Sequence, residues 1–254
     1  MKASLTLAAD APYFAGHFPG RPILPGVVAL ALMAEAAARV AGRDDPVHTI
    51  PFARLRHVAV PGDRLEVGAR KMTGGRIRAD LTRGETLIAN AAFELGPLRP
   101  AAASAPETTI VLPSADLPPP EALLPQQPPM RFVTAIAGEM PDGLICTARL
   151  PAACALADGG SAPALATIEV AAQAAATWEA LLRWRQGAAA APRMGYLVAV
   201  RDVVLFAADV PADADLAVSV RLTAAAPPLT HYAAEVARGT RRVLRGTIAT
   251  FLPG

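Results

Sequence analysis

The sequence predicts an α+β fold made of two similar halves, in each of which an antiparallel sheet wraps around one long helix. Three observations predict it: a proline-rich segment divides the chain, the elements follow the same order on both sides, and one short string in the first half has a counterpart in the second. Proline cannot complete a helix or a central strand, so the dividing segment is expected to be a linker. We predict a first domain at 1–97, a linker at 98–122 and a second domain at 123–254.

The first half begins with a loop that leads into its helix. Proline and glycine crowd residues 19–25, and an apolar, alanine-rich stretch expected to be helical follows at 26–41. Four segments with strand character come next, at 52–60, 64–72, 76–82 and 86–95. Consecutive strands after one long helix are typical of a sheet that curls around it, and small alanines suit the narrow space inside.

The second half repeats this order after two extra strands, expected at 130–136 and 144–150. A helix is predicted from Pro163 to about Gln186. Four strand-like segments follow at 195–206, 216–224, 231–238 and 242–251. The string 54–67, which reads as a strand, a proline turn with an acid and another strand, is similar to residues 200–218. This match supports a duplication.

The composition excludes several classes of protein. Of the 254 residues 53% are hydrophobic and 18% charged, which rules out disorder as the main state. The formal net charge is +2, no basic block occurs and aromatics are only 5%, so nucleic acid is not expected as a partner. The best apolar run, 27–34, is closed by Glu35 and is too short to span a membrane.

Two cysteines make neither a disulfide framework nor a metal cluster, and the N-terminus lacks the apolar segment of a signal peptide. We therefore expect a cytoplasmic protein. The sequence has no phosphate-binding glycine loop, no metal-ligand spacing and no serine nucleophile elbow. We expect neither a metal nor a cofactor.

One motif is long and specific. Residues 13–37 read YFAGHFPGRPILPGVVALALMAEAA and contain His17-Phe18-Pro19-Gly20, then Pro22, then Pro25-Gly26-Val27. This stretch resembles the FabZ/FabA class of 3-hydroxyacyl-ACP dehydratases, which have the hotdog fold. The second half resembles the same superfamily more weakly, through LPQQPPM at 124–130 and through Glu169 and Gln173 on its helix. The combination is most similar to the paired dehydratase subunits of aryl-polyene pathways, here joined in one chain as a tandem, or double, hotdog.

The resemblance implies loss of water from a 3-hydroxyacyl thioester carried by an acyl carrier protein. This reaction needs a base for the C2 proton, an acid for the 3-hydroxyl and donors for the developing enolate oxygen. By the resemblance, His17 is the base, and the Gly26 N–H at the helix N-terminus polarises the thioester carbonyl. Phe18, Pro25 and Gln173 are expected to bind substrate. The implied product is a trans-2-enoyl thioester, in fatty-acid, polyketide or aryl-polyene biosynthesis.

The sequence departs from the family at the carboxylate. The family's acid lies fourteen positions after its histidine, and that position is Ala31 here, with Glu35 one helical turn later. The first half therefore has the base without its acid. Glu35 as a displaced acid remains an alternative.

The second half has the opposite loss. Its helix carries Glu169 and Gln173 at the family spacing, but Ala155 stands fourteen residues before Glu169, and no histidine occurs between His57 and His231. In hotdog dimers of this class the histidine and the carboxylate come from different subunits. A fused chain would therefore hold one complete composite site, His17 with Glu169, and one inactive site.

Other interpretations stay open. His17 in a Pro/Gly loop is also compatible with a structural histidine, and Glu169 with a charged residue near a helix start. The chain as a whole could be an inactive acyl-binding or scaffold partner of another dehydratase, or a hotdog acyl thioesterase. A homodimer of double hotdogs also stays open. Four arginines of the second half could offer a basic surface to an acidic carrier protein or simply be solvated: Arg183, Arg185, Arg193 and Arg201.

Overall fold

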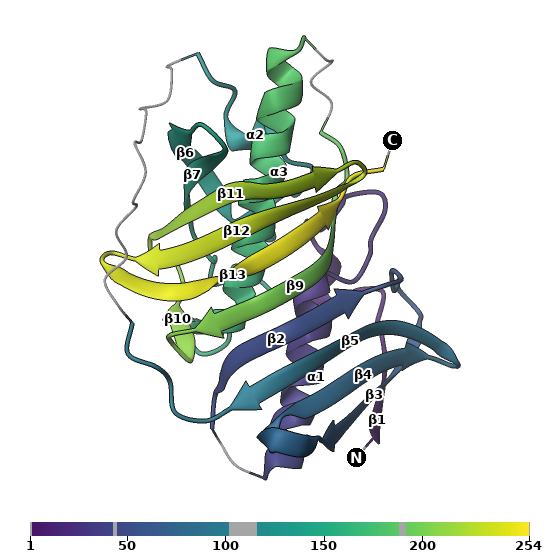
Figure 1. Ribbon diagram of the computed structural model, residues 1–254. Coiled ribbons are helices and arrows are strands. Elements are labelled where there is room, and N and C mark those ends of the chain that lie inside the picture. Colours follow the sequence, from purple (N-terminus) through teal and green to yellow (C-terminus); the bar gives the residue numbers. More distant parts are fainter. Residues whose placement is uncertain (1, 43–44, 102–115, 188–191, 254) are drawn as a thin grey trace.

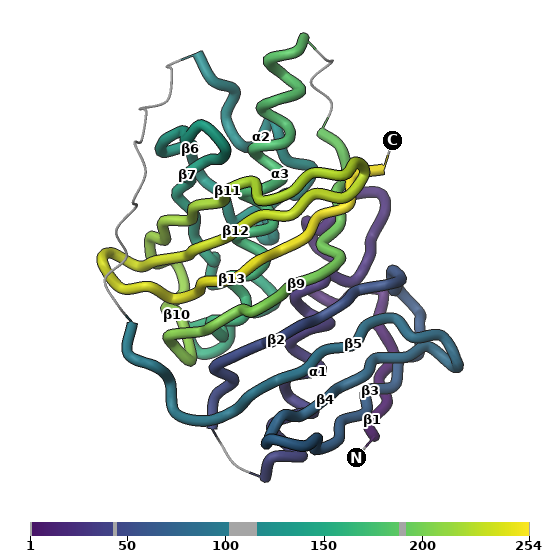
Figure 2. Tube along the Cα trace, viewed as in Figure 1, coloured from purple at the N-terminus to yellow at the C-terminus, as the bar shows by residue number. Residues whose placement is uncertain are grey.

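A computed structural model describes residues 2–42, 45–101, 116–187 and 192–253. One large curved sheet runs through the whole molecule, and two long helices lie against its concave side (Figure 1). The backbone trace shows the first half occupying one end of this sheet and the second half the other (Figure 2). The α+β architecture with one long helix in each half is confirmed.

The first half contains one long helix, five strands and two short 3₁₀ turns. In chain order they are β1 (Lys2–Thr6), η1 (Pro12–Phe14), α1 (Gly26–Ala41), β2 (Val47–Leu55), β3 (Arg64–Lys71), η2 (Thr73–Gly75), β4 (Ile77–Arg83) and β5 (Thr86–Leu95). Helix α1 begins directly after Pro25 and ends at Gly42, whose φ of 68° is left-handed and whose N–H donates to the Ala38 carbonyl. Its buried face packs against β3, β4 and β5.

The second half contains another long helix and more strands. In chain order they are α2 (Pro120–Leu123), β6 (Val133–Met140), β7 (Gly143–Ala148), β8 (Ser161–Pro163), η3 (Ala164–Ala166), α3 (Thr167–Arg185), β9 (Tyr196–Leu205), β10 (Asp209–Pro211), β11 (Leu216–Ala226), β12 (Leu229–Arg238) and β13 (Arg241–Phe251). Helix α3 packs against β7, β11, β12 and β13. Three of its alanines are fully buried there, which lets the helix lie close to the sheet: Ala171, Ala174 and Ala175.

The strand order shows that the same meander occurs twice. The eleven strands lie in the order β1-β3-β4-β5-β2-β9-β13-β12-β11-β7-β6, and β10 pairs separately with β8. The run β3-β4-β5-β2 of the first half corresponds to β11-β12-β13-β9 of the second. The two runs meet at an antiparallel pairing of β2 with β9, in which Phe52 is opposite Arg201 and Ala53 is opposite Val200. The division of the chain at 98–122 stays a proposal, and residues 102–115 of that segment lie outside the described residues.

Several element boundaries differ from the sequence prediction. Helix α3 begins at Thr167 and not at Pro163, because residues 164–166 form a 3₁₀ turn. Strand β6 begins at Val133 and not at Met130, and the N–H of Phe132 just before it bonds to the Gln173 side chain and not to a neighbouring strand. Strands β1, β8 and β10 were not predicted; β1 is an edge strand without a sustained apolar run, and the other two have three residues each. No described helix is long and apolar enough to cross a membrane.

A glycine next to the β2–β9 pairing permits unusually close strand packing. Asp202 in β9 has a φ of 50°, and the register of β9 with β13 shifts between Arg201 and Val204. Opposite this bulge lies Gly246, where an added Cβ would be 2.7 Å from the Val203 Cα and 2.6 Å from its Cγ2. Because backbone lies that close, Val203 cannot simply rotate away.

We therefore predict that Gly246→Ala lowers the free energy of unfolding by about 1–3 kcal/mol through overpacking. Urea unfolding measures the effect. The control is Gly195→Ala, where the nearest atom to an added Cβ is 3.8 Å away, an ordinary contact. Equal unfolding midpoints for the two variants would contradict the prediction.

Candidate active site

The loop that carries His17 is held against the second half of the chain. Gly16 has a φ of 76°, and an added Cβ would lie 2.2 Å from the carbonyl oxygen of Gln127. The Gln127 N–H donates to the Gly16 carbonyl at 2.8 Å. The motif loop of the first half and the loop at 124–130 of the second are thus in direct backbone contact, and only glycine fits between them.

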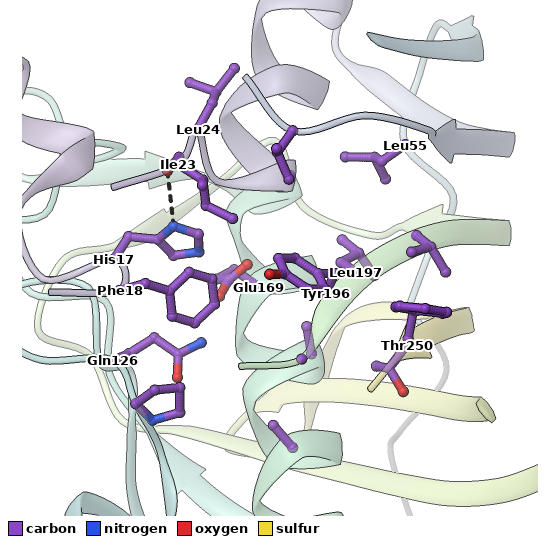
Figure 3. Close-up of a pocket in the computed structure, with 18 of the residues that line it drawn as sticks. His17, Phe18, Ile23, Leu24, Leu55, Gln126, Glu169, Tyr196, Leu197 and Thr250 are labelled. Carbon is purple, nitrogen blue, oxygen red and sulfur yellow. Dashed lines mark hydrogen bonds between the residues drawn. The ribbon is translucent and has the colours of Figure 1, made fainter. Parts of the chain in front are cut away.

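His17 is 4% exposed and is oriented by one hydrogen bond. Its Nδ1 lies 3.1 Å from the carbonyl oxygen of Ile23, and since a carbonyl can only accept, Nδ1 carries the proton. The neutral ring therefore has its free lone pair on Nε2, on the side of the ring that faces Glu169 in Figure 3. Burial lowers the pKa of His17 to about 4, although the bond to Ile23 acts in the opposite direction.

Glu169 is the third residue of α3 and is buried, with 4% of the residue exposed. Its Oε1 accepts a hydrogen bond of 3.1 Å from the Gln173 Nε2, one helical turn later. Burial raises the pKa of Glu169 to about 7, and the bond from Gln173 lowers it by less. The carboxyl group therefore keeps its proton up to near neutral pH.

Gln173 holds this acid in place. Its Oε1 accepts the N–H of Phe132 at 2.8 Å, and its Nε2 also donates to the carbonyl of Met130 at 2.8 Å. The side chain is completely buried and ties α3 to the chain just before β6. It does not line the cavity described next, although we expected it to bind substrate; its contacts make it a positioning residue for Glu169.

His17 and Glu169 line the same cavity, of about 260 Å³. Its walls come from both halves: the motif loop and the end of β2 on one side, and α3, β9 and the end of β13 on the other. Along α3 the lining residues follow one helical face: Glu169, Ala172, Ala176 and Glu179. The chain places the candidate base and the candidate acid of different halves around one space (Figure 3).

The remaining predicted site residues fall into two groups. Phe18 lines the cavity, has a left-handed φ of 59° and lies 4.3 Å from His17 between ring centres. Gly26 also lines the cavity, and its N–H, in the first turn of α1, has no hydrogen-bond partner among the residues described. Pro25 does not line the cavity; its carbonyl accepts the N–H groups of Val28 and Ala29.

Glu35 lies outside the cavity. Its side chain is 57% exposed and pairs with Arg39 one turn along α1. A surface ion pair of this kind is an ordinary helix feature. The structure thus keeps this carboxylate away from His17, whereas Glu169 lines the cavity with it.

Sequence reasoning missed several lining residues. Gln126 is buried, comes from the loop before β6, and its Oε1 has no hydrogen-bond partner in the described structure. Tyr196 lies at the start of β9 with its ring 6.3 Å from that of Phe18. His57 lies on the exposed rim together with Arg56. Gln126 lies within the motif at 124–130 and could have been predicted from it. The residues on the rim could not, because their position in the cavity depends on how the two halves pack together.

No group of three or more His, Cys, Asp or Glu side chains within the described ranges could hold a metal ion. The ionisable groups that line the deep part of the cavity are His17 and Glu169. One neutral base and one protonated acid in an apolar cavity can take up one proton and give up another. This is the arrangement that an elimination requires.

Comparison with known protein families finds two matches in tandem. A family of ApeI dehydratases (ApeI-like) matches residues 1–86, and a family of ApeP dehydratases (ApeP-like) matches residues 118–254, more than half of the chain. A FabZ 3-hydroxyacyl-[acyl-carrier-protein] dehydratase of Pelotomaculum thermopropionicum is 38% identical over 96 residues, which are 34% of this chain and 69% of that protein. A FabZ of Rhizobium rhizogenes is 43% identical over 67 residues, 24% of this chain and 43% of that protein.

Solved structures confirm the double hotdog. The dehydratase domain of RzxB from Pseudomonas fluorescens superposes with a TM-score of 0.73 at 15% identity, covering 99% of this chain and 94% of that domain. A trans-AT polyketide synthase dehydratase domain from Brevibacillus brevis gives 0.71 at 14% identity, covering 100% and 93%. A thioesterase from Novosphingobium aromaticivorans gives 0.58 at 16%, covering 100% and 96%. At these identities the likeness is one of fold.

The burial of His17 predicts how stability changes with pH. Its pKa is about 4 in the folded protein and near 6.5 in the unfolded chain, so the unfolded chain binds a proton first as pH falls. The free energy of unfolding therefore decreases as pH falls below 6.5. Between pH 7.5 and 5, the wild type should lose about 2 kcal/mol more unfolding free energy than His17→Gln, which cannot titrate. Denaturant unfolding at both pH values measures this difference, and a parallel decline of both proteins would refute the buried, neutral histidine.

Proposed function

The chain belongs to the family of FabZ- and ApeP-like hotdog dehydratases, and from this premise we propose that it removes water from a 3-hydroxyacyl thioester at a composite site of His17 and Glu169. The single observation that carries the proposal is that the His17 imidazole from one half and the Glu169 carboxyl from the other, both buried, line one cavity. Neither half contains both groups.

His17 is the base of the proposed reaction. The Nε2 lone pair takes the proton from C2, and the Nδ1–H stays bonded to the Ile23 carbonyl, which steadies the ring as it becomes positively charged. The electrons of the broken C–H bond move towards the thioester carbonyl. The unpartnered Gly26 N–H in the first turn of α1 donates to that oxygen, where the helix dipole adds to the hydrogen bond.

Glu169 is the acid. Its carboxyl proton passes to the 3-hydroxyl as the C3–O bond breaks, so that water leaves and a double bond forms between C2 and C3. Gln173 presents the carboxyl group to the substrate through the hydrogen bond to Oε1. After each turnover His17 carries a proton and Glu169 lacks one, and transfer through water restores both groups.

The pKa values support these roles at one common pH. Between about 4 and about 7, His17 is neutral and Glu169 protonated, which are the forms that the base and the acid need. Burial alone produces both shifts, because it disfavours the charged form of each group. Desolvation at the buried end of the cavity therefore favours the form that each residue needs.

The substrate carrier and the pathway are finer parts of the proposal. We propose an acyl carrier protein as the donor of the thioester, supported by the FabZ relatives named for such substrates. A role in aryl-polyene synthesis is supported by the order of the ApeI-like and ApeP-like matches in one chain. A cytoplasmic location is supported by two buried cysteines that are not joined.

Incubation with a 3-hydroxyacyl-ACP and mass detection of the loss of one water tests the reaction itself. Release of a free thiol without loss of water would instead indicate a thioesterase. No turnover of any 3-hydroxyacyl thioester would indicate an inactive acyl-binding partner.

Variants at the two residues test the composite site. We predict that His17→Ala and Glu169→Gln each lower kcat by about 10²- to 10⁴-fold, because each removes one proton-transfer group. The double variant should be hardly slower than the slower single variant, since two groups that act in one step are not additive. Initial rates with 3-hydroxyacyl-ACP measure these effects. If the loss of rate in the double variant equalled the product of the two single losses, the two residues would act independently and not in one step.

Glu35→Gln is the matched control, because it removes an exposed carboxylate on the helix of the first half. It should keep the wild-type rate. Ala31→Glu should not rescue Glu169→Gln, because the new acid would stand in a half-site that has no histidine opposite it. If Glu35→Gln were damaging and Glu169→Gln silent, the composite site would be wrong.

The pH profile provides a further prediction. The value of kcat/KM should rise as pH passes about 4, where His17 loses its proton, and fall as pH passes about 7, where Glu169 loses its own. The variant Glu169→Gln should lose the falling limb while any residual activity keeps the rising one. If the pH profile of Glu169→Gln kept the same falling limb as the wild type, that limb would belong to a group other than Glu169.

A further inference from the structure

A second acid lines the cavity ten residues after Glu169. Glu179 lies on the same face of α3, about 15 Å along the helix axis at 1.5 Å per residue, and two alanines separate the acids on that face. Figure 3 shows Thr250, a hydrogen-bond partner of Glu179, on the opposite side of the view from His17. The proposed reaction makes no use of Glu179.

The sheet fixes one oxygen of this carboxylate. The Tyr232 hydroxyl donates to Glu179 Oε1 at 2.8 Å and the Thr250 hydroxyl donates to the same atom at 2.9 Å. Both donors are buried, at 1% and 6% exposed, so the side chain is held from two strands. Among the described residues, none donates a hydrogen bond to Oε2 and none forms an ion pair with Glu179. The carboxylate is therefore a fixed acceptor with one oxygen to spare.

The exposed lining residues show where the cavity opens. Arg56, Val58, Arg193 and Phe251 are exposed, whereas His17 and Glu169 at the reactive end are buried. Phe251 directly follows Thr250 in β13, and Arg193 bonds to the Pro253 carbonyl, so Glu179 lies near the exposed side of the cavity that Arg193 and Phe251 form. A carrier protein is too large for a cavity of about 260 Å³, and only its thioester arm can reach the reactive end. An arm that enters past Arg193 and Phe251 passes Glu179 on its way to His17 and Glu169.

We infer that Glu179 binds an amide N–H of the pantetheine arm that carries the substrate, and so sets how deeply the thioester enters. This inference rests on the proposed dehydration. Ten bonds separate C3 of the substrate from the second amide nitrogen of the arm, which is roughly 12 Å in an extended chain at about 1.2 Å per bond. This length is within about 3 Å of the rise of about 15 Å along α3 between Glu169 and Glu179. An N–H donor also suits an acceptor-only carboxylate.

Two thioesters of the same 3-hydroxy acid test the inference. The pantetheine thioester has both amides, and the N-acetylcysteamine thioester has only the first. In Glu179→Gln the amide oxygen can still accept from Tyr232 and Thr250, which directs the NH₂ group towards the arm, where it meets another donor. We expect KM for the pantetheine thioester to rise about tenfold, as for loss of a hydrogen bond to a charged group, with kcat unchanged and KM for the shorter thioester unchanged.

Glu85→Gln, in the exposed turn between β4 and β5, is the matched control and should change neither KM. Glu179→Asp, which withdraws the carboxylate by one methylene, is a second variant should Glu179→Gln fold poorly, and we expect the same pattern. An equal change of KM for both thioesters, or no change for either, would overturn the inference. A change seen only with an acyl chain that carries a terminal hydroxyl would place the donor on the acyl group and would also overturn it.

Binding of a saturated acyl-pantetheine thioester, which has no water to lose, is measured in parallel by calorimetry. If wild type binds it about tenfold more tightly than Glu179→Gln but dehydrates nothing, the proposed function fails and the arm site stands. If wild type dehydrates both thioesters and the binding is equal, the arm site fails and the proposed function stands.

Discussion

Main-chain pairing between β2 and β9 is the constraint on which the rest of the molecule depends. Each half alone would expose one of these strands as an open edge, with a row of unpaired N–H and C=O groups. Their antiparallel pairing removes both edges and joins the meanders into one sheet. It also sets the positions of α1 and α3, because each helix packs on its own half of that sheet. The cavity is bounded by the ends of these same strands.

Burial of both reactive groups is the chemical counterpart of this constraint: of the described residues that line the cavity, His17 and Glu169 are the buried ionisable ones. A buried ionic pair would cost desolvation of both groups, whereas a neutral imidazole and a neutral carboxyl do not. Burial holds both groups in this neutral state, whereas the single hydrogen bonds orient them: Ile23 accepts from His17, and Gln173 donates to Glu169. Gln173 in turn depends on the loop before β6, so the acid is oriented by the backbone of its own half.

Much of this arrangement could be predicted from the sequence, and the reasons differ by residue. The helix at 26–41 matches α1 because Pro25, Gly42 and an apolar run mark its ends and its body. The pairing of His17 with Glu169 in one cavity could be anticipated because each half lacks what the other has. Gln173 was expected to bind substrate; it does not line the cavity, and its amide bonds to Met130, Phe132 and Glu169, contacts that the sequence does not indicate. Glu179 and Tyr196 had no motif to mark them, because their place in the site depends on where strands end.

Joining both halves in one chain also changes the stoichiometry of the site. A composite site assembled from two separate proteins is lost when dilution separates them, and its amount follows the scarcer partner. In the proposed site, every chain that folds brings its own base and acid together at a high effective concentration, because both belong to one chain. The proposed site needs only one base and one acid, and the chain carries one of each at the positions the family motif uses, His17 and Glu169, with Ala31 and Ala155 at the other two.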